Sequence, residues 1–469
     1  MLRRPLALAL ALSLLPAAAQ ADDLLQTYQN ARSNDPQYAA AENNRLATRE
    51  GAVQARAAML PQIGGNATLR RSESDGPSTF QSDPTQPRVS GDISSTTTSR
   101  NVGVDGTQML YDRSRFTTLQ GQRALSRASD FQLESAGDSL ITRTAAAYFN
   151  VLVQLETLAA AEAAESALKK QFDFASKRLE VGLAPITDVH EARAQYDAAR
   201  ANTILARNAV QDAYQSLVEI TGQPVASLKA LPDDFKPALP EARNADGWVQ
   251  AALAQNPALQ AKQAQVEFTR ANVETARAGH WPTLYLNGGY GRQSTWGERT
   301  FSSGAFNNTS PINSEGRGPT VGLTLNIPIF NGWATQSRVR QALAQRDVAE
   351  DELEQQRRAL ERSTRNAYQT LVAGITEVEA RRLALFSARS AYEASQVGLE
   401  VGTRTVLDVL NNQRTLFSAQ QAYALAKYNF MQNRLLLEQA AGTLDVADVQ
   451  DVNRLLTVDQ PVAPLPRSN

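Results

Sequence analysis

The chain has two long stretches without proline, one between Asp112 and Pro185 and the other from Ala334 to Glu400. A helix of roughly 70 residues is about 100 Å long, which is wider than a compact domain. Apolar residues of the first stretch recur at steps of three and four, the spacing of one helix face; they are Ile141, Ala145, Tyr148, Leu152, Leu155 and Ala159. Each stretch is therefore predicted to form one extended helix that buries a narrow apolar stripe against partner helices, as in a coiled coil.

A similar short segment follows each long stretch. In both, a glycine stands where a helix C-terminal cap is expected and an aspartate follows it six residues later: Gly182 with Asp188, and Gly402 with Asp408. Thr405 and Asp408 also have the spacing of a capping box at the start of a new helix. The pattern predicts a helix, a tight turn and an antiparallel return helix in both places.

The two halves of the chain match each other at a nearly constant offset of about 220 residues. The matches include Asn34-Asp35-Pro36 with Gln255-Asn256-Pro257, Pro61 with Pro282, Ala147-Tyr148 with Ala367-Tyr368, and Gly222 with Gly442. A period this long makes each half a large unit with several elements, unlike a solenoid repeat. We therefore expect two structural repeats, 22–240 and 241–445, followed by a C-terminal segment and flexible tail at 446–469.

Each repeat is expected to contain a helix, two strands around a polar loop, a long helix and a return helix. The loop at 72–100 is rich in Ser, Thr, Asp, Gly and Pro, which is typical of solvated segments, and 294–318 is expected to be a second polar loop. The strands beside them alternate apolar and polar residues. The alternating apolar residues are Val102, Val104, Met109 and Tyr111, then Leu284, Leu286 and Tyr290, and, on one face of the last strand, Val321, Leu323, Leu325 and Ile327.

The first residues have the form of a secretory signal. Met1-Leu2-Arg3-Arg4 precedes an apolar stretch over 6–15, and Ala19-Gln20-Ala21 precedes Asp22. We expect a signal peptide at 1–21. No later stretch has the roughly 18 consecutive apolar residues that a membrane-spanning helix needs. The net charge of −1 gives no electrostatic reason to expect a nucleic-acid partner.

The usual chemistry of enzymes is scarce in this sequence. The chain has no cysteine, which excludes disulfides and thiolate metal sites, and its two histidines are predicted to be surface residues, His190 and His280. We find no nucleophile, metal or phosphate-binding motif. The chain is predicted to be neither an enzyme nor a cofactor-binding protein.

The strands raise the question of whether the sheet closes within a lipid bilayer. A bilayer accepts strands only as closed barrels of about eight strands or more, so four strands per chain are too few. Two copies would supply about eight strands, which fill their own interior, whereas three would supply about twelve and leave a passage. The prediction is a mainly α-helical protein whose three copies form a 12-stranded outer-membrane β-barrel, with the polar loops outside the cell and the long helices lining a periplasmic cylinder.

The sequence resembles the TolC family of outer-membrane channel proteins over nearly the whole mature chain. The motifs that carry the resemblance are Thr144-Ala145-Ala146-Ala147-Tyr148-Phe149-Asn150-Val151-Leu152, Ile186-Thr187-Asp188-Val189 and Val401-Gly402-Thr403-Arg404-Thr405. The resemblance implies a homotrimer in outer-membrane lipid with a helical periplasmic tunnel and a mixed belt around it, formed by 231–240 and the region after Gly442. It implies an exit duct for drug efflux or type I protein secretion, working with a periplasmic adaptor and an inner-membrane transporter of ABC, RND or MFS type.

The resemblance also assigns residues to a gate at the periplasmic end of the tunnel. Arg404, Asp188 and Thr187 match positions of the gate, where links between neighbouring helices hold the tunnel shut. Asp408 matches the acidic constriction just inside, where a ring of carboxylates attracts cations. A purely structural role is the alternative: both aspartates would stabilise helix starts by about 0.3–1 kcal/mol, and Arg404 would be a solvated surface charge.

Two positions depart from the family pattern. Leu399 stands where the family has a tyrosine that contributes a gate bond, and Asn411 stands where a second aspartate would lie. We therefore expect fewer gate links and a weaker acidic filter.

A second function from another class is a periplasmic or surface coiled-coil scaffold or adhesin that conducts nothing. The alternation in the strands and the absence of a cysteine for lipid attachment favour the channel.

Overall fold

The computed structural model describes residues 23–81, 84–85, 87–183, 185–225, 227–240, 243–304 and 306–461, so the expected signal peptide lies outside the described residues. The chain forms two compact units. The helical unit comprises residues up to Leu46, 128–263 and those from Glu352 onward, and the sheet unit comprises 47–127 and 264–351.

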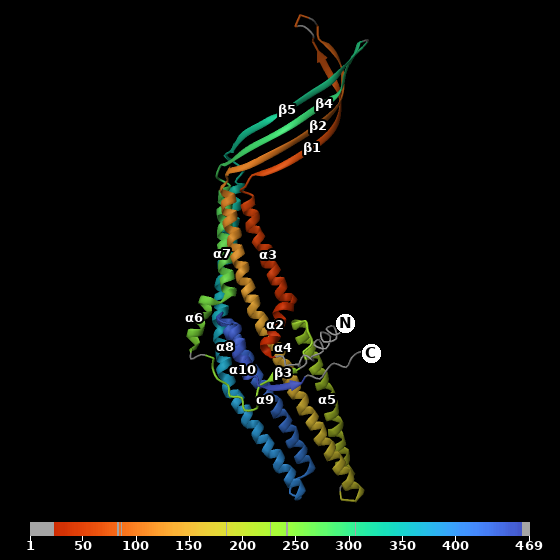
Figure 1. Ribbon diagram of the computed structural model, residues 1–469, viewed down its shortest axis with the longest axis vertical. Helices are drawn as coiled ribbons and strands as arrows, with labels where there is room; N and C mark the ends of the chain where they lie inside the picture. Colours follow the sequence, from red (N-terminus) through yellow and green to blue (C-terminus); the bar gives the residue numbers. More distant parts are fainter. Residues whose placement is uncertain are drawn as a thin grey trace, which may run out of the picture. The chain divides into compact units, whose positions relative to one another are not determined.

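The order of elements is the same in the two halves (Figure 1). The first half contains α2 (Leu24–Asn34), α3 (Pro36–Ala57), β1 (Gln62–Phe80), β2 (Val89–Tyr111), α4 (Arg113–Glu180) and α5 (Ile186–Thr221). The second contains α6 (Ala245–Gln255), α7 (Pro257–Ala278), β4 (Thr283–Ser303), β5 (Phe306–Asn326), α8 (Ala334–Glu400) and α9 (Val406–Ala441). The two extended helices are confirmed, with 68 residues in α4 and 67 in α8.

The first helix of each half is broken, whereas the sequence predicted one continuous helix. Asp35 and Asn256 are extended, with ψ angles of 118° and 119°, and each ends one helix directly before a proline that starts the next. The proline ring disfavours the helical conformation in the residue before it. Proline therefore interrupts the helix at the same place in both halves.

The two predicted polar loops are largely wrong. The segment 72–100 is mostly strand, because β1 reaches Phe80 and β2 begins at Val89. The described residues of 294–318 are strand except for Gly304, a turn residue. Cross-strand backbone hydrogen bonds form whatever the side chains, and threonine itself favours strands. A polar composition signals a loop only where the chain lacks a strand partner. β5 ends at Asn326, so Ile327, which was expected within this strand, lies just beyond it, before Pro328.

The sheet contains β1, β2, β4 and β5 in that order, each antiparallel to its neighbour. The pairing of β2 with β4 joins the two halves and places Val102 opposite Arg292 and Val104 opposite Tyr290. β1 and β5 lie at the edges, and neither has a second partner among the described strands. The sheet of one chain is therefore open.

The two faces of this sheet differ in polarity. Directly paired residues share a face, and successive residues alternate between faces. The register places one set of apolar side chains together on what we call the apolar face: Ile63, Leu69, Val102, Val104, Leu286, Tyr290, Val321, Leu323 and Leu325. These side chains remain exposed, to 77% at Ile63 and 82% at Val321. The opposite face is rich in glycine and polar residues, including Gln62, Asn66, Asn101, Asp105, Asn287 and Gln293.

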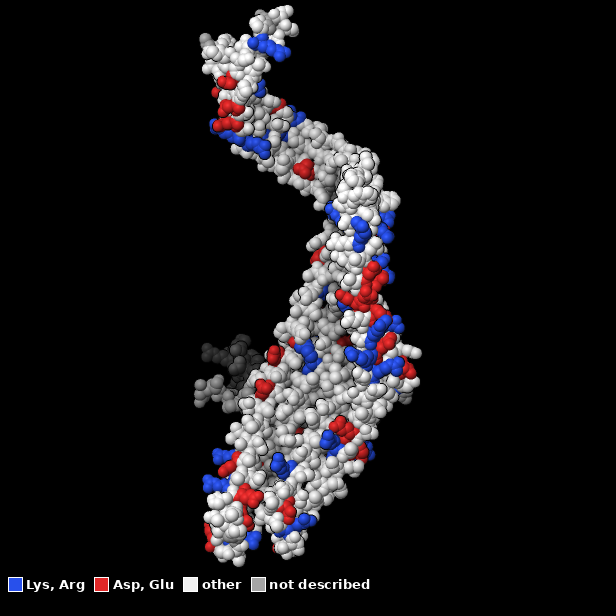
Figure 2. Space-filling view, turned by 180° about the vertical axis from the view of Figure 1, so that it is seen from behind, with Lys and Arg blue, Asp and Glu red and all other residues white. Residues whose placement is uncertain are grey.

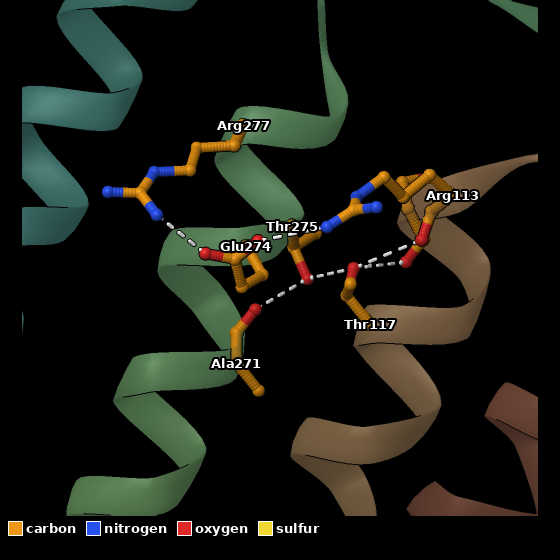
Figure 3. A network of polar contacts seen from close by, with 7 residues as sticks. Arg113, Thr117, Ala271, Glu274, Thr275 and Arg277 are labelled. Atoms are coloured by element: carbon orange, nitrogen blue, oxygen red, sulfur yellow. Dashed lines mark hydrogen bonds and ion pairs between the residues drawn. The ribbon is translucent and has the colours of Figure 1, made fainter. Parts of the chain in front are cut away.

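Within the sheet unit, a polar network joins the start of α4 to the end of α7 (Figure 3). Glu274 accepts from Arg113 at 3.2 Å and from Arg277 at 2.7 Å. The Thr117 and Thr275 hydroxyl oxygens lie 2.7 Å apart. Helices from different halves of the chain are thus tied together next to the strands that they continue.

In the helical unit, tyrosine hydroxyl groups hold the segment that follows α5. The Tyr148 hydroxyl donates to the Lys229 carbonyl oxygen at 2.9 Å and accepts from the Lys229 N–H at 2.7 Å. The Tyr214 hydroxyl makes the same pair of bonds with Val225, both at 2.9 Å. Each tyrosine satisfies both backbone groups of one residue, so this connector is fixed against the helices.

The described part of the C-terminal segment, up to Pro461, is ordered. α10 (Val446–Leu455) begins with a capping box formed by Asp445 and Asp448. β6 (Val458–Pro461) pairs with β3 (Ser227–Ala230) in a separate two-stranded sheet. Asn453 accepts from the Leu24 N–H and donates to Asp23. Contacts with the start of the chain and with the connector therefore order this segment.

A buried carboxyl lies where α9 faces α10. Glu438 is 4% exposed and accepts from Arg434 at 3.3 Å, and Asp448 and Asp451 lie on the α10 side. Burial, and then the charge of Asp448, raise the pKa of Glu438 to about 7, although Arg434 opposes the shift. Because the folded pKa lies above the unfolded value of 4.5, the stabilisation is complete below pH 4.5 and is lost as the pH rises towards 7.

The variant Glu438→Gln should remove this pH dependence. The parent protein is expected to lose up to about 3 kcal/mol of stability between pH 4.5 and pH 8, and the variant to lose much less, because glutamine does not ionise. Urea unfolding followed by circular dichroism at several pH values measures the difference. A control, Glu219→Gln at an exposed position on α5, should follow the parent curve; parallel curves for parent and Glu438→Gln would contradict the assignment.

Candidate channel gate at the helical turns

The turn between α4 and α5 is closed by hydrogen bonds of the backbone. Gly182 has a φ of 72°, a conformation that glycine adopts without strain. Its N–H donates to the Leu179 carbonyl at 2.9 Å, and the Leu183 N–H donates to the Arg178 carbonyl at 2.8 Å. These bonds satisfy the last carbonyl groups of α4, so the predicted glycine cap is confirmed.

The turn between α8 and α9 has the same form with additional side-chain bonds. Gly402 has a φ of 79°, and the Thr403 and Arg404 N–H groups both donate to the Gly398 carbonyl, at 2.8 and 3.1 Å. The predicted capping box is present: the Thr405 N–H donates to Asp408 Oδ2 at 3.0 Å, and the Asp408 N–H donates to Thr405 Oγ1 at 3.2 Å. Local chemistry thus defines both ends of this turn.

Arg404 lies over the helix that precedes it. A Cβ atom added to Gly398 would come within 2.6 Å of Arg404 Cγ, so the side chain passes directly across this glycine. Within the described residues of one chain, no hydrogen bond or ion pair joins Arg404 to Asp188. The sequence did not predict the contact between Gly398 and Arg404, because no local pattern shows that a glycine within a helix will be covered by a side chain that follows the turn.

Asp408 has a stabilised negative charge. The Thr405 N–H and hydroxyl groups, and then the nearby Arg404 charge, lower the pKa of this carboxyl. Because the folded pKa lies below the ordinary 3.8, the carboxylate persists at neutral pH, and its stabilising contribution is lost only as the pH falls through the lowered value. The side chain can therefore cap the helix and carry a fixed charge at the same time.

The remaining residues of the predicted gate are accessible in a single chain. Thr187 and Asn411 are exposed, and Asp188 and Leu399 are half-buried, with Asp188 in the first turn of α5. His190 and His280 are both exposed, as predicted. No group of three or more acidic or histidine side chains in the described part of the chain is arranged to hold a metal ion. Nor does any described helix have the length and apolar content needed to cross a membrane.

The fold is that of outer-membrane channels. The structure aligns with the crystal structure of the Campylobacter jejuni CmeC outer membrane channel with a TM-score of 0.70 at 16% identity, over 93% of this chain and 90% of that one. The model of the outer membrane efflux protein family matches residues 27–223 and 248–443. The chain belongs to the outer membrane efflux protein family.

Two curated relatives extend the similarity over almost the full length. Outer membrane protein TolC of Vibrio cholerae is 33% identical over 456 residues, which cover 97% of this chain and 98% of that protein. The alkaline protease secretion protein AprF of Pseudomonas aeruginosa is 29% identical over 94% of this chain and 88% of its own length. The chain is therefore an exit duct in the outer membrane of a Gram-negative bacterium, in a family of channels rather than enzymes.

Proposed function

We propose that three copies of the chain form a channel with a 12-stranded barrel in the outer membrane and a helical tunnel in the periplasm. The observation that carries the proposal is the open sheet, with unpaired edges at β1 and β5 and an exposed apolar face. Edge strands satisfy their backbone groups only by pairing, and lipid demands complete pairing. Joining β1 of one copy to β5 of the next closes the sheet with the apolar face towards lipid and the polar face towards the passage.

The proposed position in the outer membrane and periplasm implies which proteins the channel works with. The channel takes drugs or type I secretion substrates from inner-membrane transporters of ABC, RND or MFS type, joined by periplasmic adaptors. Support comes from relatives named for efflux and for protease secretion. The helical turns are the ends of the tunnel that face the adaptor, and the gate lies there, with Arg404, Thr187 and Asp188 in the links and Asp408 as an acidic ring.

Arg404→Ser should raise single-channel conductance in planar bilayers. An exposed ion pair contributes at most about 1 kcal/mol, so three copies of one link hold a closed state by about 3 kcal/mol or less. Removing the charge is expected to shift the channel markedly towards open states. Arg414→Ser, at an exposed position further along α9, should leave conductance unchanged. Equal conductance for the parent and Arg404→Ser would remove Arg404 from the gate.

Asp408→Asn should weaken cation preference, because it removes one carboxylate per copy from the constriction while keeping its size. The reversal potential in a salt gradient should move towards zero. Asn411→Asp adds a carboxylate near the same level and should move it the other way. Because the pKa of Asp408 is lowered, the preference of the parent should persist at pH 5 and fall only below about pH 3.8. An unaltered reversal potential in Asp408→Asn would contradict the ring.

The competing function is a scaffold or adhesin without conduction. Planar-bilayer recording of the purified parent chain separates the two, because a scaffold gives no current. A stable monomer that never inserts into lipid would refute the proposed channel.

A further inference from the structure

The apolar face of the sheet becomes charged at one level. Val104, Tyr290 and Pro319 form one cross-strand row, and the next row contains Arg292 and Arg317. Beyond it, Arg100 pairs with Ser294 and Leu69, and Arg71 lies one row further along β1. By register, these four side chains share the apolar face, and we call them the arginine row: Arg71, Arg100, Arg292 and Arg317. Figure 2 shows basic side chains collected at one level of the sheet, with acidic ones beside them.

Two members of the arginine row are free to bind a partner. Arg292 pairs with Glu315, and Arg71 pairs with Glu73 at 3.1 Å. The Arg100 and Arg317 side chains are exposed and make no ion pair or hydrogen bond with another described residue. The row thus presents two unpaired guanidinium groups per chain next to two neutralised ones.

The row lies where lipid headgroups would meet the barrel. Arg317 is eight residues from Leu325 along β5, a distance of about 26 Å in a strand. Because barrel strands tilt by about 40°, this length spans about 20 Å across the membrane, and the long arginine side chains reach the edge of an apolar band of about 25 Å. The row lies towards the turn at Gly304, where β4 ends, at the end of the strands opposite the helices. An exposed Trp296 follows on the same face, and tryptophan is enriched where lipid meets water.

We propose that Arg100 and Arg317, supported by Arg71 and Arg292, bind the phosphate groups of phosphorylated glycolipid in the outer leaflet. The planar guanidinium group donates two parallel hydrogen bonds to phosphate oxygens, and lipid chains below it cover the apolar face. At this level the opposite face carries one arginine, Arg70, beside Asn101 and Gln293, against four arginines on the side that meets lipid, so most of the positive charge lies on the lipid side. This inference rests on the proposed barrel and adds a lipid partner to it.

The test uses the full chain in detergent with diphosphoryl lipid A as the probe. Arg100→Gln/Arg317→Gln should weaken binding roughly 25-fold, because each arginine near an anionic lipid surface contributes about fivefold. The matched control is Arg70→Gln/Arg299→Gln, which removes the same charge from the opposite face and should change affinity less than about twofold. Arg100→Lys/Arg317→Lys keeps the charge and should lose much less than the glutamine variant.

Three results would overturn the inference: an equal loss in the control pair, equal affinity of the parent for lipid A without phosphates, or displacement of lipid A by dilute inorganic phosphate. The last would indicate a site for free anions. Planar-bilayer conductance is measured on the same preparations. If the parent and the glutamine variant conduct equally and also bind lipid A equally, the proposed lipid site is refuted but the proposed channel is not. If the parent does not conduct, the proposed channel function is refuted.

Discussion

Replacing Gly442 by alanine is expected to destabilise the helical unit by about 2–5 kcal/mol. Gly442 ends α9 with a φ of 70°, which costs other residues about 1–2 kcal/mol. An added Cβ would also lie 2.6 Å from Asn256 N and Cα and from Gln255 C. These are backbone atoms of the break between α6 and α7, which cannot rotate away, and forced displacement of packed structure costs about 1–3 kcal/mol more.

Two other glycines separate the two contributions. Gly402 has a φ of 79°, and a Cβ atom added there would have no other atom within 4 Å. Gly402→Ala is therefore expected to lose only the backbone strain of about 1–2 kcal/mol in stability. Gly222→Ala should lie between, because its Cβ would make one contact below 3 Å, with Asn34 Cβ at 2.9 Å, rather than three contacts with backbone atoms at 2.6 Å. Urea unfolding followed by far-ultraviolet circular dichroism ranks the three. Equal losses at Gly442 and Gly402 would show that the contact with Asn256 is unimportant.

Removing the carboxylate of Glu156 is expected to cost about 3–5 kcal/mol. Lys427 on α9 is 1% exposed, and its Nζ lies 3.3 Å from Glu156 Oε1 on α4. The Tyr428 hydroxyl donates to the same oxygen at 2.9 Å, and the ammonium lies 5.1 Å from the centre of the Tyr423 ring. Glu156→Gln leaves a buried ammonium group without its counter-charge, which is the costly way to break a buried pair.

The expected pattern is non-additive. Lys427→Met should cost less than Glu156→Gln, because Glu156 is 28% exposed and keeps partial hydration, and the double variant should recover most of the loss. The matched control is Glu162→Gln, which breaks the exposed pair with Arg207 between α4 and α5 and should cost less than about 1 kcal/mol. Losses that simply add in the double variant would show that the two charges are not coupled.

Several features of the fold could be predicted from short-range chemistry. The long helices, the return helices and the glycine caps at Gly182 and Gly402 follow from helix periodicity and from residues a few positions apart. The apolar face of the sheet follows from alternation, because a strand turns every second side chain to the same side. The gate roles of Arg404, Asp188, Thr187 and Asp408 remain predictions, since each would act between copies of the chain.

The errors have a common origin in pairing. Ser-Thr-rich segments at 72–100 and 294–318 carry no apolar alternation, so nothing local distinguishes a solvated loop from a polar strand whose backbone is paired. The order of the segment 446–461 likewise depends on distant partners, β3 and Asp23, which no local pattern indicates.

The internal repeat is visible in the sequence, whereas the contacts that its residues make are visible only in the structure. The sequence alone establishes that Asn34-Asp35-Pro36 and Gly222 have counterparts at Gln255-Asn256-Pro257 and Gly442. That each glycine rests against its asparagine, and that Lys427 and Glu438 are buried, was decided by the tertiary structure. Helix periodicity and helix caps depend on residues a few positions apart. These contacts join segments that are far apart in the sequence and meet only after the helices have packed, so no local sequence pattern indicates them.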